Sequence, residues 1–211
     1  YQIAEGLRLH EGLGHAAARA RTIELLREVG IPAPEQRARE YPHQWVLEAA
    51  GPWGRGWIAA LLNWADRAAD LALDLRALGR GETPCHVHEF WSRTYARAVG
   101  QVRFERVPPH GCRAALVRRV EAGPQWIGST LHLVQGTGVA GWQAAPGSVV
   151  LDLEAGRALE GSVLLWLPDI PLPRIAAAEK AAARLEAAGE GLWRAQVQTG
   201  PEAARLVLEW P

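Results

Sequence analysis

The stretch WIAALLNWADRAADLALDL, from Trp57 to Leu75, contains the residue pattern that recurs along most of the chain. Its second half alternates apolar and polar residues, a period of two that is typical of a β-strand with one buried face. Similar short segments, separated by Gly, Pro and Asp, recur along the chain and predict an antiparallel β-sandwich. The predicted strands are Trp57–Trp64, Ala69–Leu75, Cys85–Trp91, Gln101–Val107, Cys112–Val120, Ser129–Gln135, Ser148–Glu154, Ser162–Pro168, Leu192–Gln198 and Ala204–Trp210.

One segment departs from this pattern. Residues 175–188 read IAAAEKAAARLEAA and end at Gly189. Alanine has the highest helix propensity and glycine commonly follows the last helical residue, so this segment is predicted to be a helix.

The first 44 residues have a different composition, rich in Ala, Arg and Glu. Ile23, Leu26 and Val29 fall on one side of a helix predicted over 16–29. The fold class expected for the whole chain is therefore mainly β. A short α-helical segment, 1–44, precedes an antiparallel β-sandwich, 45–211, which includes the further helix near 175–188.

The overall composition excludes several classes of partner. With 23 basic and 23 acidic residues the formal charge is zero, which removes the electrostatic basis for binding nucleic acid. No apolar stretch approaches the ~20 residues of a membrane span, and the first residues do not resemble a signal peptide. A cytoplasmic location is expected. The chain has no methionine, so it is expected to be part of something longer.

The amino-acid sequence of residues 1–44 resembles that of one protein family. The phrases QIAEGLRLHEGL, ARARTIELLREVGIP and AREYPHQ are similar to the helical subdomain of oligopeptide and dipeptide ABC transporter ATP-binding subunits. In that family YPHQ is followed at once by the signature that contacts ATP, whereas here Gln44 is followed by WVLEAAG. The sequence also lacks a GxxxxGK[ST] phosphate loop, so ATP hydrolysis and a nucleotide cofactor are not expected.

Residues 57–167 resemble a second family. LLNWADRAADLALDLRALG, HVHEFWSRTYA, VPPHGCRAALVRRV and GSTLHLVQG are similar, in this order, to the C-terminal β-domain of α-galactosidase-type (melibiase-like) glycoside hydrolases. The resemblance implies that the two catalytic carboxylates belong to a preceding (β/α)₈ barrel, for which this sequence has no room. Asp66, Asp70 and Asp74 are interpreted as turn and outward-facing strand residues, so no catalytic residue is assigned and the chain alone is expected to be inactive.

The histidines could suggest a metal site. In PCHVHEF, His86 and His88 share one strand face and Cys85 and Val87 the other, and a histidine pair at this spacing can chelate zinc. A third ligand is lacking, because His110 and His132 belong to separate phrases. His10, His15 and His43 have no fixed ligand spacing. No metal and no cofactor are predicted.

Sequence context predicts the surroundings of the two cysteines and of six tryptophans. Cys85 and Cys112 either form a single disulfide or, the favoured alternative, remain two free buried thiols, with Cys112 entering the core after a tight PPHGC turn. An aromatic ring can stack on a pyranose sugar. Trp53 and Trp57 are flanked by glycines and are the candidates for exposure. Core packing is expected for four further tryptophans in apolar strand contexts, Trp64, Trp91, Trp126 and Trp166.

Three functions remain open from the sequence. The first is a non-catalytic C-terminal β-sandwich portion of a carbohydrate-active enzyme, fused near Gln44–Trp45 to a transporter ATPase segment and partnered by a missing (β/α)₈ domain. The second is an interaction piece derived from a peptide ABC transporter. The third is a free-standing carbohydrate-binding module, which requires an exposed aromatic platform.

Overall fold

The computed structural model describes residues 8, 12–28, 42–154 and 156–211. The chain divides into two compact units, Tyr1–Pro42 and His43–Pro211. In the first unit the predicted helix is confirmed as α2, His15–Glu28. Ala18 is fully buried and Ile23 is half-buried. Val29 lies outside the described residues, as do 1–7, 9–11 and 30–41 of the predicted helical segment 1–44.

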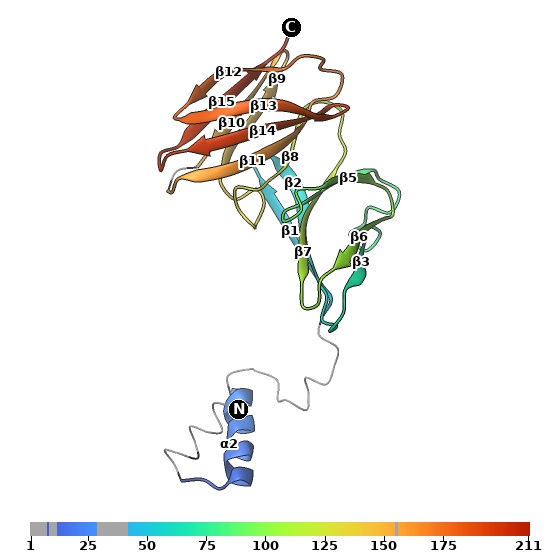
Figure 1. Ribbon diagram of the computed structural model, residues 1–211, viewed down its shortest axis with the longest axis vertical. Coiled ribbons are helices and arrows are strands. Elements are labelled where there is room, and N and C mark those ends of the chain that lie inside the picture. The colour runs from blue at the N-terminus through green and yellow to red at the C-terminus, as the bar shows by residue number, and fades with distance from the viewer. Residues whose placement is uncertain (1–7, 9–11, 29–41, 155) are drawn as a thin grey trace. The chain divides into compact units, whose positions relative to one another are not determined.

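The second unit is mainly β and antiparallel, as predicted (Figure 1). Its first half is a five-stranded sheet in the order β1-β2-β7-β4-β5, together with a two-stranded ribbon of β3 and β6. The strands are β1 (Gln44–Gly51), β2 (Gly54–Leu62), β3 (Ala69–Asp74), β4 (Cys85–Glu89), β5 (Tyr95–Ala98), β6 (Gln101–Val107) and β7 (Cys112–Arg119).

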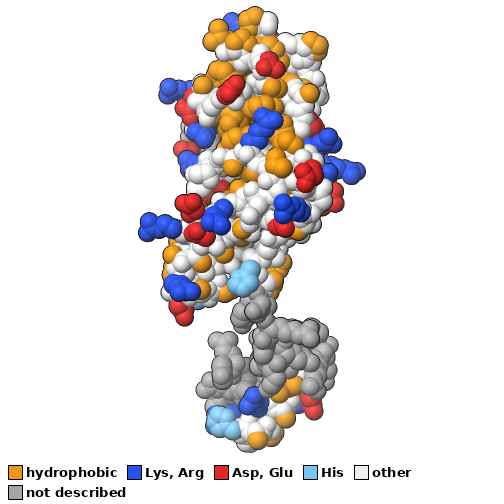
Figure 2. Space-filling model, turned by 90° about the vertical axis from the view of Figure 1, so that its right-hand side faces the viewer, with side chains coloured by type: hydrophobic (Ala, Val, Ile, Leu, Met, Phe, Trp, Pro, Cys, Tyr) orange, Lys and Arg blue, Asp and Glu red, His pale blue; other side chains and the backbone are white. Residues whose placement is uncertain are grey.

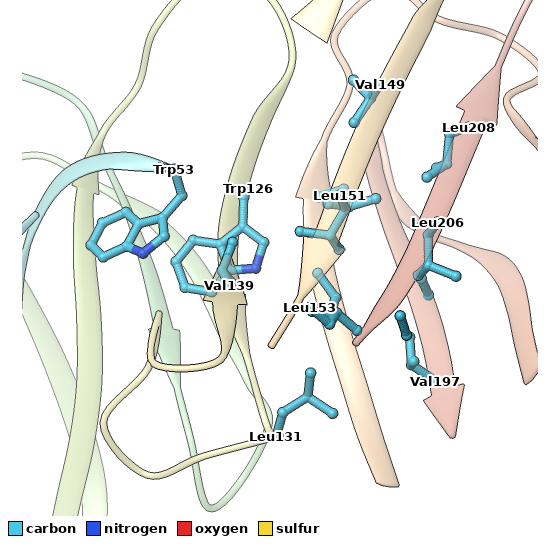
Figure 3. Close-up of a cluster of buried hydrophobic side chains, with 14 of the residues drawn as sticks. Trp53, Trp126, Leu131, Val139, Val149, Leu151, Leu153, Val197, Leu206 and Leu208 are labelled. Atoms are coloured by element: carbon cyan, nitrogen blue, oxygen red, sulfur yellow. The ribbon is translucent and has the colours of Figure 1, made fainter. Parts of the chain in front are cut away.

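The second half consists of two four-stranded sheets in the orders β12-β15-β10-β9 and β13-β14-β11-β8. Their facing side chains fill a common core, in which Leu151 and Leu206 are fully buried (Figure 3). This is the predicted sandwich, although it occupies only the second half of the unit. Its strands are β8 (Gln125–Ser129), β9 (Val139–Ala145), β10 (Ser148–Leu153), β11 (Leu159–Trp166), β12 (Arg174–Glu179), β13 (Ala181–Gly189), β14 (Leu192–Thr199) and β15 (Ala204–Glu209).

The helix predicted over 175–188 is wrong. This segment forms β12 and β13, which belong to different sheets and meet at Lys180, whose φ of 54° turns the chain between them. β12 pairs with β15 and β13 pairs with β14. Each strand gains a row of hydrogen bonds and an apolar face against the core, and these tertiary interactions override the helix propensity of alanine.

Several strand assignments also change, and β5 and β9 form where no strand was predicted. Of the strand predicted over 129–135, only Ser129 lies in a strand, as the last residue of β8. The residues after it form a loop in which Leu133 and Val134 are exposed. β1 was not predicted as a strand, because its composition does not alternate. It pairs residue by residue with β2, from Gln44 with Leu61 to Gly51 with Gly54.

The cysteines are both free, which confirms the favoured alternative in part. Cys85 is buried, and its burial raises the pKa of the thiol. Cys112 is exposed, so its predicted entry into the core is wrong. The tight turn before it is confirmed by the bond from Gly111 N to Pro108 O at 3.0 Å, but Cys112 is the first residue of β7, where the face of the sheet is uncovered.

Candidate functional site

One hollow of the β-rich unit brings together the side-chain types that bind small polar ligands. It has a volume of about 410 Å³ and lies where β5, the end of β11 and the β13–β14 turn meet. We call it the Trp166 hollow. Its principal lining residues are Tyr95, Arg97, Trp166, Asp169, Glu190 and Leu192.

The position of Trp166 follows from the geometry of β11. It is the last residue of the strand, and the turn before β14 packs directly against it through the bond from Leu167 N to Gly191 O at 2.7 Å. Gly191 has a φ of 66°, and a Cβ at this position would lie 2.9 Å from the indole ring. Glycine is therefore required here both by the backbone conformation and by the close approach of the ring.

A buried hydrogen-bonded chain fixes Tyr95 at the edge of the hollow. The Tyr95 hydroxyl lies 2.8 Å from His86 Nδ1, and His86 Nε2 lies 3.2 Å from Gln125 Oε1. Because an amide oxygen only accepts, Nε2 carries the proton of the neutral imidazole and Nδ1 accepts from the phenol. Gln125 is held in turn by donating to Arg119 O at 3.0 Å.

Burial keeps His86 and Tyr95, the first two residues of this hydrogen-bonded series, neutral. It lowers the pKa of His86 to about 4, against the smaller opposite effect of the Gln125 hydrogen bond, and the charges of Arg118 and Arg97 lower it further. Burial also raises the pKa of Tyr95 to about 12, although Arg97 works in the opposite direction. At neutral pH the chain therefore presents an uncharged phenol beside Trp166.

The charges around the hollow are mixed. The guanidinium carbon of Arg97 lies 5.8 Å from the centre of the Trp166 ring, and Asp169 and Glu190 supply two carboxylates to the lining. On the face shown in Figure 2, positive and negative side chains are interspersed over the β-rich unit. The half-buried indole of Trp166, whose ring centre also lies 5.2 Å from that of His86, is bordered by donors and acceptors, a combination that suits a neutral ligand rich in hydroxyl groups.

His88 belongs to a second buried network, which joins the five-stranded sheet to β8. His88 Nδ1 donates to Gln135 Oε1 at 2.6 Å, and Gln135 Nε2 returns a bond to His88 O at 3.1 Å. Burial lowers the pKa of His88, although Gln135 and Glu89 act in the opposite direction. The predicted strand faces are confirmed, since Cys85 and Val87 lie in the core on the other side. Both histidines serve as neutral hydrogen-bonding groups at this contact.

The indole of Trp53 also packs at the contact between the five-stranded sheet and β8. Trp53 is 4% exposed and packs against Trp126 at 5.0 Å between ring centres (Figure 3). Arg118 lies 5.2 Å from the Trp53 ring and donates through Nη1 to Trp126 O. Burial lowers the pKa of Arg118 to about 10, with Glu121 opposing. The predicted exposure of Trp53 is therefore wrong, because its flanking glycines let the backbone pack closely around a buried ring.

The other tryptophans divide between confirmed and wrong predictions. Trp126 is fully buried as expected, and Trp57 and Trp166 are half-buried. Trp64 and Trp91 are 37% and 52% exposed instead of packed in the core. Both follow the last residues of a strand, where the apolar pattern continues beyond the covered part of the sheet.

The three aspartates lie where the sequence placed them. Asp70 and Asp74 are exposed on β3 and accept from Arg106 N at 2.9 Å and Arg76 N at 2.8 Å. Asp66 lies in an exposed bend, 3.0 Å from His110 Nε2. The Asp74 contact closes a local turn, the Asp70 and Asp66 contacts join segments far apart in the sequence, and none of these three aspartates lines the Trp166 hollow.

The described residues offer neither a metal cluster nor a membrane-spanning helix. Over the parts of the chain that the structure describes, no group of three or more His, Cys, Asp or Glu side chains is placed to hold a metal ion. Among the described residues, no helix has the length and apolarity that crossing a membrane demands.

The stability of the unit should fall as the pH drops from 7.5 to 5. His86 has a pKa of about 4 in the fold and about 6.5 when unfolded, so the unfolded chain binds more protons between these values. We expect unfolding by urea to be easier by about 2 kcal/mol at pH 5 from His86 alone, with His88 acting in the same direction. His86→Gln should reduce this dependence. Equal stability at both pH values would contradict the assignment.

Comparison with known proteins identifies one short segment of the chain. No protein-family model matches the chain. A stretch of 44 residues, 21% of the chain, is 54% identical to the dipeptide transport ATP-binding protein DppD of Haemophilus influenzae and covers 13% of it. DppD of Escherichia coli is 46% identical over 44 residues, again 21% of this chain but 14% of its own length. The peptidoglycan transport ATP-binding protein YejF of Agrobacterium fabrum is 54% identical over 43 residues, which are 20% of this chain and 8% of YejF.

The chain thus contains a segment similar to peptide-transport ATP-binding proteins, and it spans between 8% and 14% of the length of these relatives. Among solved structures, isomalto-dextranase of Arthrobacter globiformis T6 complexed with panose aligns with 84% of this chain and 38% of its own. The TM-score is 0.33 and the sequence identity 12%. A likeness at this level defines neither fold nor function.

Proposed function

We propose that residues 45–211 are a non-catalytic β-sandwich portion of an α-galactosidase-type, carbohydrate-active enzyme, and that the Trp166 hollow holds a saccharide. The observation that carries the proposal is the convergence of Trp166, Tyr95 and Arg97 with two carboxylates in one hollow. The C–H face of a pyranose packs on an indole ring, and its hydroxyls pair with carboxylate and guanidinium groups.

The family resemblance supports the same proposal. Its phrases fall on successive parts of a single unit, from β2 and β3 through β4 and the β6–β7 hairpin to β8. On this proposal the partner is a (β/α)₈ catalytic domain that would supply the two carboxylates for hydrolysis, and residues 1–44 are a passenger segment of ABC transporter type. The cytoplasmic location stays a prediction from sequence.

The proposal is tested by titrating the full chain with melibiose, an α-galactosyl disaccharide, in a calorimeter. Saturable binding is expected, and Trp166→Ala should weaken it at least tenfold because the stacking surface is lost. Trp64→Ala removes a surface indole on the β2–β3 connection and should leave the affinity unchanged. Absence of saturable binding to melibiose and to longer α-galactosides would overturn the proposal.

A second candidate rests on the 54% identity over 44 residues with the transport ATP-binding protein of Haemophilus influenzae. In this case the chain would act as an interaction piece of a peptide ABC transporter. Binding of a fluorescent ATP analogue to the chain distinguishes the two candidates. Saturable binding at micromolar concentrations would favour the transporter candidate. We expect none, because the sequence lacks the phosphate loop. The third candidate, a free-standing carbohydrate-binding module, shares the saccharide site and differs only in having no catalytic partner.

A further inference from the structure

A second hollow lies on the same sheet as the Trp166 hollow. It has a volume of about 560 Å³, and its lining includes Arg93, Glu160, Ala182, Arg184, Gln196 and Gln198. We call it the Gln198 hollow. Glu160, Arg184 and both glutamines are exposed, so their polar groups face solvent.

The strand register relates the two hollows. Gln198 lies between Glu160 of β11 and Ala182 of β13, and Gln196 lies between Ser162 and Arg184 in the next outward-facing row. Two rows further along the same face, Trp166 lies opposite Leu192, which lines the Trp166 hollow. Glu160 and Trp166 are six residues apart on one strand, which corresponds to about 20 Å.

The row between the hollows contains an ion pair and one buried leucine. Arg194 of β14 and Glu186 of β13 are partners in the register, and their charged groups lie 3.7 Å apart with side chains 30% and 39% exposed. Their neighbour on β11 in this row is the buried Leu164. Ion-paired groups with exposed surface can still accept and donate bonds to hydroxyls along the path from one hollow to the other.

One hairpin borders both hollows. The turn between β4 and β5 contributes Arg93 to the Gln198 hollow, and β5 contributes Tyr95 and Arg97 to the Trp166 hollow. The turn is fixed by the buried carboxylate of Glu89, which accepts from Ser92 N at 2.6 Å and from Ala114 N at 3.2 Å. The two hollows therefore share a sheet face as their floor and this hairpin as a wall.

We propose that the two hollows are the ends of one cleft that binds an extended neutral oligosaccharide. One sugar stacks on Trp166, and sugars farther along the chain bond to the amides of Gln196 and Gln198. A primary amide both donates and accepts, as a sugar hydroxyl does, and it carries no charge. This inference rests on the proposed function and extends it from a single sugar to a chain of several.

The test is a calorimetric series of galactose, melibiose, raffinose and stachyose against the full chain. These ligands run from one to four sugar units. We expect the affinity to rise at least tenfold from the monosaccharide to the tetrasaccharide. The double variant Gln196→Ala/Gln198→Ala should lose about tenfold in affinity for stachyose and nothing for galactose. Trp166→Ala should weaken the binding of both.

The matched control is Gln143→Ala, which removes an exposed glutamine from β9 in the other sheet. It should bind every ligand as the parent chain does. Equal affinity for all four ligands, or a double variant that binds stachyose normally, would overturn the single cleft while leaving the proposed function intact. Absence of binding to every ligand would instead refute the proposed function, and the cleft with it.

Discussion

Gly128→Ala is expected to cost the β-rich unit about 3 kcal/mol. Gly128 lies in β8 and faces His88 of the five-stranded sheet. A Cβ at this position would lie 2.5 Å from Gln135 Oε1 and 2.6 Å from His88 Nδ1. Both side chains are buried and bonded to each other, so neither can move without breaking the His88–Gln135 network.

The measurement is thermal unfolding of the parent chain and the variant at pH 7.5. A loss of this size corresponds to a drop of about 10 °C in Tm for a unit of this length. Gly200→Ala is the control, because a Cβ there meets no atom within 4 Å. Its Tm should be equal to that of the parent or slightly higher. If Gly128→Ala unfolded at the parent temperature, the close contact between the sheets would be wrong.

Trp53→Ala is expected to destabilise the same unit by about 3–5 kcal/mol, the usual cost of truncating a buried aromatic residue. The ring packs against Trp126 and faces the Arg118 guanidinium. The loop after β8 also rests on it: Gly136 has a φ of 92°, and a Cβ there would lie 2.6 Å from the indole. The variant would leave a cavity beside a buried cation.

Urea unfolding of Trp53→Ala and Trp45→Ala gives the comparison. Trp45 lies on β1, the strand before the turn that holds Trp53, but is 48% exposed, so its loss should cost less than about 1 kcal/mol. Equal destabilisation by the two variants would show that Trp53 is not part of the core.

The sequence predicted those features of the fold that depend on local pattern. The alternation in Ala69–Leu75 and Ser148–Glu154 and the tight turn at Pro108–Gly111 were sufficient to place two strands and one reversal. The segment around Lys180 could not be placed, because alanine fits a helix by propensity and a strand only when two sheets are present to receive it. The burial of Trp53 likewise depends on Trp126, 73 residues away in the sequence.

The candidate site was not predicted at all. Tyr95, Trp166 and Glu190 come from three separate segments, each of which reads as an ordinary strand end or turn. Trp166 was assigned to the core because its neighbours are apolar, yet as the last residue of β11 it extends to the end of the sheet. Only the pairing of β11 with β14 and the packing of β5 beside them bring these side chains together.

The most direct test of the saccharide site is the indole N–H signal of each tryptophan in an ¹⁵N-correlated NMR spectrum of the full chain. The Trp166 signal should shift progressively and saturate as melibiose is added, and the signal of Trp126, which is fully buried in the core, should stay in place. Assignment by Trp166→Phe and Trp126→Phe identifies the two peaks. A Trp166 signal that does not move at saturating sugar concentration would contradict a saccharide site in this hollow.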